Sequence, residues 1–135
     1  MSDESPMYAA ETNGVIVRVV TSYLPQQSEP PQQYVWAYMI EIENAGEKTV
    51  QLVSRHWIIT DGQGRVEEVQ GEGVVGEQPV IEPGEIYQYA SGCPLSTTTG
   101  SMVGTYRMID EDGDEFDAAI PAFSLDLPGE RRVVN

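Results

Sequence analysis

The sequence has 135 residues, which is the length of one domain with its own hydrophobic core. Seven basic and 22 acidic side chains give a formal net charge of −15, and such a charge repels nucleic-acid phosphates and anionic lipid surfaces. The single cysteine cannot form an intramolecular disulfide, no signal peptide is recognisable, and no stretch approaches the ~20 apolar residues of a membrane span. We therefore expect a cytoplasmic protein that binds neither nucleic acid nor membrane.

The ordered domain is expected to span residues 8–127. Residues 1–7 are polar and show no hydrophobic periodicity, so a disordered lead-in is predicted there. The turn signal Pro128-Gly129 is expected to end the ordered part, which leaves residues 128–135 as a C-terminal tail.

The domain begins with two predicted strands and a loop. Residues 8–12 are expected to form a short edge strand, and Asn13-Gly14 then turns the chain because both residues tolerate positive φ. The β-branched density of residues 15–24 predicts a strand that is buried on at least one side. Three prolines within residues 25–31 predict a loop, because proline cannot donate to a strand ladder.

The clearest strand pattern lies in residues 34–44, where apolar side chains alternate with partly polar ones. The positions expected to face the core are Trp36, Tyr38, Ile40 and Ile42. A hairpin turn over residues 44–48 leads to a partner strand over residues 50–61. Apolar residues change parity within that partner strand, and a β-bulge around residues 54–56 would reconcile the two halves.

The second half of the domain continues with short strands and turn signals. Strands are predicted over residues 65–69, 86–91, 102–109 and 116–120, and residues 121–127 continue extended. Between them lie a glycine loop over residues 71–76, a small-residue loop over residues 92–99 and the hairpin signal Asp112-Gly113. No helical periodicity is present, and turn signals about every 8–12 residues are typical of an all-β sandwich or barrel.

The glycine loop contains the pattern G-x-G-x-x-G at Gly71, Gly73 and Gly76. In dinucleotide-binding folds this pattern begins a helix whose amides hold a pyrophosphate, but here Pro79 follows and no helix start is present. Glutamates crowd the loop, and Arg65 is the only basic residue near it. A closely packed loop that needs glycines for its backbone is the first interpretation, and a phosphate site bridged by Mg²⁺ is the alternative.

Two further residue types could carry chemistry, namely the only histidine and the only cysteine. His56 lies between Arg55 and Trp57, and successive strand residues point to opposite faces, so these three side chains cannot form one cluster without a bulge. His56 is interpreted as a structural histidine, with a general base as the alternative. Cys93 has no neighbouring base or cation that would lower its pKa, so we assign it no catalytic role.

The acidic run over residues 110–115 suggests a calcium loop at first sight. An EF-hand loop requires glycine at its sixth position and glutamate at its twelfth, and this chain has Glu115 and Pro121 there. A solvated hairpin tip is therefore predicted, with weak cation binding as the alternative. The aromatic residues are interpreted as core, with one or two tyrosines as alternative surface anchors: Trp36, Tyr38, Trp57, Tyr87, Tyr89, Tyr106 and Phe123.

Several segments resemble the bacterial ApaG family. They are YVWAY (34–38), IEN (42–44), QLVSRHWIITD (51–61), EVQGEGVVGEQP (68–79), PG..Y.Y.SG (83–92) and GTY.M (104–108). The resemblance covers nearly the whole domain, and it implies a fibronectin type III-like β-sandwich without an established enzymatic activity. It also implies a suggested pyrophosphate-binding role for the glycine loop, here Gly71, Gly73 and Gly76. Related domains in eukaryotic F-box and polymerase-interacting proteins look like interaction modules, which implies protein partners.

These observations predict an all-β, immunoglobulin- or fibronectin type III-like antiparallel β-sandwich of about seven to eight strands. We expect a non-enzymatic protein-binding module with no catalytic residue, metal or cofactor, whose interaction surface includes Arg55 and His56. The alternative function is Mg²⁺-assisted binding of pyrophosphate or nucleotide phosphates at Gly71, Gly73 and Gly76, with His56 as a base. Expected partners are other proteins, or a second copy of the chain in a homodimer.

Overall fold

The structure of the protein, a computed structural model, describes residues 7–128. Within this range the chain forms nine β-strands and one short 3₁₀ helix. They are β1 (Met7–Thr12), β2 (Val15–Tyr23), η1 (Pro25–Gln27), β3 (Tyr34–Asn44), β4 (Val50–Asp61), β5 (Val66–Glu72), β6 (Val80–Ile81), β7 (Ile86–Leu95), β8 (Thr99–Asp110) and β9 (Glu115–Asp126). No helix within residues 7–128 has the length and apolar character that a membrane crossing needs.

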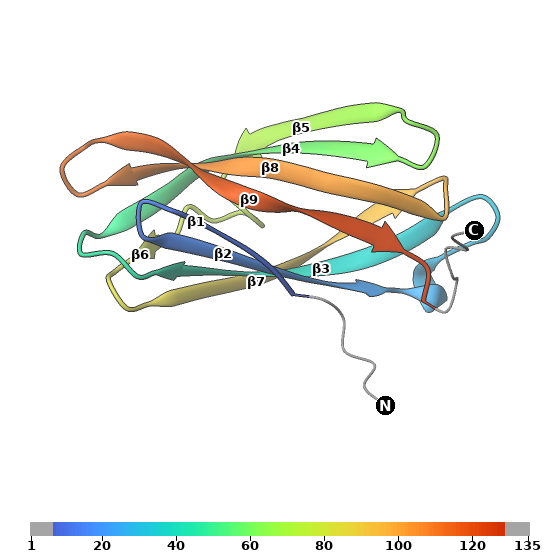
Figure 1. The fold of residues 1–135 in the computed structure, drawn as a ribbon, viewed down its shortest axis with the longest axis horizontal. Coiled ribbons are helices and arrows are strands. Elements are labelled where there is room, and N and C mark those ends of the chain that lie inside the picture. Colours follow the sequence, from blue (N-terminus) through green and yellow to red (C-terminus); the bar gives the residue numbers. More distant parts are fainter. Residues whose placement is uncertain (1–6, 129–135) are drawn as a thin grey trace, which may run out of the picture.

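The strands form two antiparallel sheets that pack face to face (Figure 1). One sheet has the order β1-β2-β3-β7, and the other has the order β5-β4-β8-β9, with the two-residue strand β6 paired to β4. The prediction of an all-β antiparallel sandwich is therefore confirmed. The described strands number one more than expected, because β6 is too short to give a sequence signal.

The core lies between the two sheets and is built from alternate residues of each long strand. Strand β3 shows this most clearly, because Trp36, Tyr38, Ile40 and Ile42 are buried as predicted. The predicted aromatic core is also confirmed: Trp57, Tyr106 and Phe123 are buried in the cluster, and Tyr87 and Tyr89 pack against it. The Trp36 indole Nε1 donates to the Asp126 carbonyl at 2.8 Å, which ties the two sheets together across the core.

Strand β4 changes its buried face through a β-bulge, as the change of parity predicts. The pairing register with β8 shifts between Leu52 and Ser54, so the inserted residue is Val53 rather than a residue within 54–56. Leu52 before the bulge and Trp57 after it are both buried, although they lie on opposite parities of the sequence.

Several predicted boundaries are wrong in detail. Gly71 belongs to strand β5 and not to a loop, and residues 92–95 continue strand β7. Strand β1 begins at Met7, one residue before the expected start of the domain. Residues 1–6 of the predicted lead-in (1–7) and residues 129–135 of the predicted tail (128–135) lie outside the described residues.

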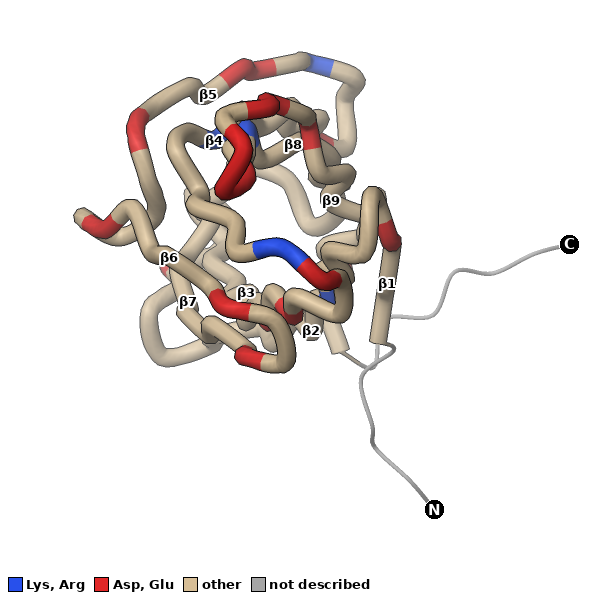
Figure 2. Tube along the Cα trace, turned by 90° about the vertical axis from the view of Figure 1, so that its left-hand side faces the viewer, with Lys and Arg blue, Asp and Glu red and all other residues tan. Residues whose placement is uncertain are grey.

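The two sides of the sandwich differ in how their edge strands are covered. On one side β1 and β9 lie against each other: the rings of Tyr8 and Phe123 are 6.0 Å apart, and the Ala119 amide donates to Thr12 Oγ1 at 3.0 Å. The opposite side carries the edge strands β5 and β7 together with the glycine-bearing connection (Figure 2).

Candidate functional site

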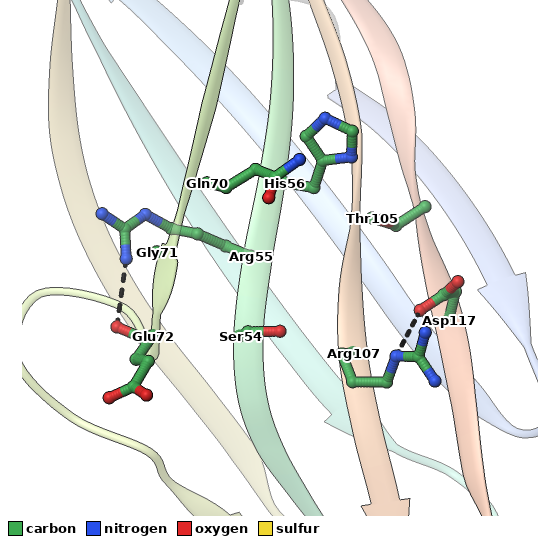
Figure 3. A pocket seen from close by; sticks show the side chains of 9 residues that line it. All are labelled: Ser54, Arg55, His56, Gln70, Gly71, Glu72, Thr105, Arg107 and Asp117. Atoms are coloured by element: carbon green, nitrogen blue, oxygen red, sulfur yellow. Dashed lines mark hydrogen bonds and ion pairs between the residues drawn. The ribbon is translucent and has the colours of Figure 1, made fainter.

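A groove of about 420 Å³ crosses the outer face of the β5-β4-β8-β9 sheet (Figure 3). Its lining residues are Ser54, Arg55, His56, Gln70, Gly71, Glu72, Thr105, Arg107 and Asp117. They come from four strands that are distant in sequence and adjacent in the sheet. The groove therefore brings together both predicted surface residues, Arg55 and His56, and one residue of the glycine motif, Gly71.

His56 lies on the outer face of β4, where it is open to solvent. Its ring Nε2 is 2.8 Å from Glu68 Oε1, on the neighbouring strand β5. Across the groove, the Arg107 guanidinium contacts Glu115 Oε1 and Asp117 Oδ1, each at 3.0 Å. Because these side chains are well exposed, the ion pairs contribute little to stability and mainly fix the pattern of charge over the groove.

Arg55 has a structural contact pattern, although it lines the same groove. Its Nη1 donates to the carbonyls of Glu72 at 3.1 Å and of Gly73 at 2.9 Å. In Figure 3 its side chain passes Gly71 toward Glu72, whereas the ring of His56 lies on the other side of β4. The adjacent residues thus diverge, as strand geometry requires, and Arg55 holds the end of β5 in place.

Gly71 lies opposite Arg55 in the strand register and allows the guanidinium to lie against the backbone. A Cβ atom at this position would lie 2.8 Å from both terminal guanidinium nitrogens of Arg55. The first glycine of the motif therefore leaves room for a neighbouring side chain and does not form a turn.

The two other glycines shape a tight turn after β5. Gly73 has φ +64°, and a Cβ atom there would lie 2.2 Å from the Glu77 carbonyl oxygen. Val74 and Glu77 exchange backbone hydrogen bonds of 2.8 and 2.9 Å, and the Gly73 amide donates to the Val53 carbonyl. Gly76 has φ +83° with open space around it.

This turn differs from a phosphate cradle in two respects. A cradle needs several successive amides that converge on the anion, but the amides of Gly73, Val74 and Glu77 already donate to backbone carbonyls, which leaves only those of Val75 and Gly76. The turn leads to the short strand β6, which begins at Val80, and not to a helix with free N-terminal amides. The Glu77 carboxylate accepts a hydrogen bond from the Tyr87 hydroxyl at 2.9 Å, which adds negative charge beside the turn.

Acidic residues recur along β5 and its connection to β6, on the side of the sandwich that faces the viewer in Figure 2. Arg65, the only basic residue near the glycine motif in the sequence, pairs with Asp61 at 2.8 Å. The lining itself holds two arginines and two carboxylates, and the excess of carboxylates comes from Glu68 and Glu115, which border the groove through their contacts with His56 and Arg107.

The acidic hairpin between β8 and β9 has the local geometry of a turn. Asp110 Oδ1 accepts hydrogen bonds from the amides of Asp112 and Asp114 at 2.9 and 3.0 Å, and Lys48 Nζ is 2.6 Å from Asp112 Oδ2. Carboxylate oxygens of these three aspartates lie within 4.8 Å of one another. The predicted hairpin tip is thus confirmed in its backbone, and weak cation binding there stays a prediction.

A partly buried polar contact between the sheets was not predicted from the sequence. The hydroxyl groups of Tyr89 on β7 and Tyr106 on β8 share a hydrogen bond, and burial raises the pKa of both well above the ordinary tyrosine value. Burial also raises the pKa of the Cys93 thiol to about 11. Only the packing of the two sheets against each other brings Tyr89 to Tyr106, so their partnership left no signal in the sequence.

Nearly the whole chain, including the groove residues and the turn, is similar to known proteins. A family model for the ApaG domain matches residues 25–110. Protein ApaG of Mesorhizobium japonicum is 58% identical over 130 residues, and that of Methylocella silvestris is 56% identical, in each case over 96% of this chain and 100% of the relative. The crystal structure of an ApaA protein from Bordetella pertussis is 47% identical with a TM-score of 0.82, and the match covers 94% of this chain and 99% of that chain. The chain therefore belongs to the ApaG family.

Proposed function

We propose that the protein is a non-enzymatic, cytoplasmic protein-binding module that contacts its partner through the groove on the β5-β4-β8-β9 sheet. The observation that supports this most is the origin of the groove residues: His56, Thr105 and Arg107 project from paired, rigid strands and not from loops. A pre-ordered surface of this kind binds without the entropy cost of ordering a loop.

The charge of the groove favours a partner segment with basic residues. Four carboxylates border the groove or pair with residues in it, namely Glu68, Glu72, Glu115 and Asp117. The exposed cation in the groove is Arg107, which already contacts two of these carboxylates. A basic segment would gain from this potential mainly through faster association, so the affinity should weaken as the salt concentration rises.

The contacts of His56 support a binding role over a catalytic one. Within the described residues, the only hydrogen bond of its ring goes to Glu68. Ser54 lines the same groove but is not bonded to His56, so no serine nucleophile is activated by the histidine in this arrangement.

The experiment compares partner capture from cytosol by the wild-type protein and by two arginine variants of β8. Thr105→Arg fills the groove, and Ser101→Arg adds the same side chain to an exposed position of the same strand outside the groove. We expect proteins captured by the wild type and by Ser101→Arg to be lost with Thr105→Arg. Equal capture by all three folded proteins would exclude the groove as the binding surface.

Binding of pyrophosphate or nucleotide phosphates at Gly71, Gly73 and Gly76 remains the alternative. The carboxylates beside the turn would oppose it unless Mg²⁺ bridges the phosphate to the protein. Titration calorimetry with pyrophosphate, with and without Mg²⁺, separates the two functions: saturable heat at millimolar ligand or below supports the alternative, and its absence excludes it.

A further inference from the structure

Strand β7 differs from the other sheet edges in being long, open and free of charged side chains. The edges β1 and β9 cover each other on the far side of the sandwich. The edge β5 carries Glu67, Glu68 and Glu72 among its seven residues, and charged side chains protect an edge against pairing with another chain. Strand β7 has ten residues and no Asp, Glu, Lys or Arg, and within residues 7–128 it pairs only with β3.

The hydrogen-bond pattern shows which backbone groups of β7 face outward. The Asn44 amide donates to the Glu85 carbonyl, so the even-numbered residues of β3 form their backbone hydrogen bonds toward β7. The Val35 carbonyl accepts a hydrogen bond from the Leu24 amide, so the odd-numbered residues of β3 form theirs toward β2. The β7 residues that pair with odd-numbered residues of β3 therefore direct their amides and carbonyls to the free edge: Ile86, Gln88, Ala90 and Gly92. Pro94 follows in the same series, which fits a residue without an amide proton.

An apolar groove adjoins this edge on the outer face of the β1-β2-β3-β7 sheet. Its volume is about 310 Å³, and Met7, Val20, Met39 and Ala90 contribute its apolar lining. Met39 is 56% exposed and lies opposite Ala90 in the register. Because Ala90 is small, a side chain on a strand added beside β7 would reach over it to Met39.

Carboxylates border the groove at its other end. Glu41 pairs with Gln88 and Glu43 with Ile86 in the register, and Arg18 contacts both carboxylates, at 3.4 and 2.7 Å. Two negative charges thus share one cation, and the net charge of the chain is −15. A strand with a basic residue near Gln88 would complement this end.

From this combination we infer that β7 accepts an extended segment of a partner protein as an additional strand. The segment carries an apolar side chain opposite Ala90 and basic residues toward Ile86. Main-chain hydrogen bonds to Gln88 and Ala90 supply affinity, and the alternate side chains supply specificity. A second copy of this chain fits less well, because it brings the same excess of carboxylates and a further −15 of net charge. This inference is independent of the groove on the other sheet.

The test uses a synthetic peptide of ten residues with alternating valine and threonine and a lysine pair at one end. A second peptide has glutamates in place of the lysines. Binding to the full-length protein is followed by fluorescence anisotropy, and amide hydrogen exchange shows which backbone amides become protected. Ala90→Pro removes an outward amide of β7, and Val66→Pro is the matched control. The Asp61 amide donates to the Arg65 carbonyl, and this register turns the amide of the next residue, Val66, to the free edge of β5.

We expect the lysine peptide to protect the amides of Gln88 and Ala90 and to bind at least tenfold more tightly than the glutamate peptide. Ala90→Pro should weaken binding at least tenfold, and Val66→Pro should change it by less than twofold. The protection measured on the wild type decides the question even if a proline variant does not fold. No binding at millimolar peptide, protection on another strand, or a dimer of the protein that Ala90→Pro dissociates would each overturn the inference.

Discussion

The glycine motif allows a matched test, because Gly73 and Gly76 share a positive φ but differ in their surroundings. Gly76→Ala places a Cβ in open space, so it should cost only the strain of a left-handed backbone, about 1–2 kcal/mol of unfolding free energy. Gly73→Ala adds a clash, because its Cβ would lie 2.2 Å from the Glu77 carbonyl oxygen.

Relief of this clash requires the backbone to separate and breaks the two hydrogen bonds between Val74 and Glu77. Each bond contributes about 1 kcal/mol, so Gly73→Ala should cost about 3–4 kcal/mol in total. Urea unfolding followed by circular dichroism measures both variants against the wild type. If Gly73→Ala is no more destabilising than Gly76→Ala, the glycine at 73 is not explained by the close approach of the backbone.

Three other predictions follow from the contacts between the sheets and at the end of β5. Arg55→Lys should lower the unfolding free energy by about 1–2 kcal/mol, because the shorter lysine side chain does not place its ammonium at the position from which Nη1 donates to both carbonyls; full stability in urea would contradict this. Burial raises the pKa of Tyr89 and Tyr106, so the contribution of the two neutral hydroxyls to stability is complete below pH about 10 and is lost as the pH rises further. The unfolding free energy of a Tyr89→Phe/Tyr106→Phe variant should therefore fall less steeply above pH 10 than that of the wild type. The Cys93 thiol, 4% exposed and with its pKa raised to about 11, should react with a thiol reagent at pH 8 only at the rate of unfolding, and rapid reaction of the folded protein would show that the site is open.

Where apolar and polar side chains alternate strictly along a strand, the sequence was sufficient to predict the strand and its buried face. The alternation from Trp36 to Ile42 gave both the limits and the buried face of β3, because one register alone places all four large side chains in the core. The bulge in β4 was predictable in existence but not in position. Val53 and the residues after it all suit a strand, so only the pairing with β8 fixes the inserted residue.

Segments of small residues were harder to predict because their conformation depends on a neighbouring strand. Residues 92–95 read as a loop, yet they continue β7 because Cys93 and Leu95 pair with β3 and bury their side chains. The glycine motif predicted a loop at Gly71, yet this residue lies within β5, and the Arg55 guanidinium occupies the space that a side chain at this position would fill.

The candidate site was only half predictable for the same reason. His56 could be singled out by its residue type, and its strand parity after the bulge places it on the outer face. Thr105 lies in the GTY.M segment, which assigns it no role, and Arg107 and Asp117 carry no recognisable motif. All three join His56 only through the pairing of β4, β8 and β9. A pattern within one segment cannot report a surface that is built across four strands.

The central claim is that the segment from Gly71 to Gly76 shapes the backbone beside a protein-binding groove and does not hold an anion. The most direct measurement is a titration of the ¹⁵N-labelled protein with pyrophosphate and Mg²⁺, followed by the amide resonances of Val75 and Gly76. These amides are not engaged in the backbone hydrogen bonds of the described turn, so they would report a phosphate seated there. We predict that they do not shift at millimolar ligand, and saturable shifts confined to these amides would contradict the account.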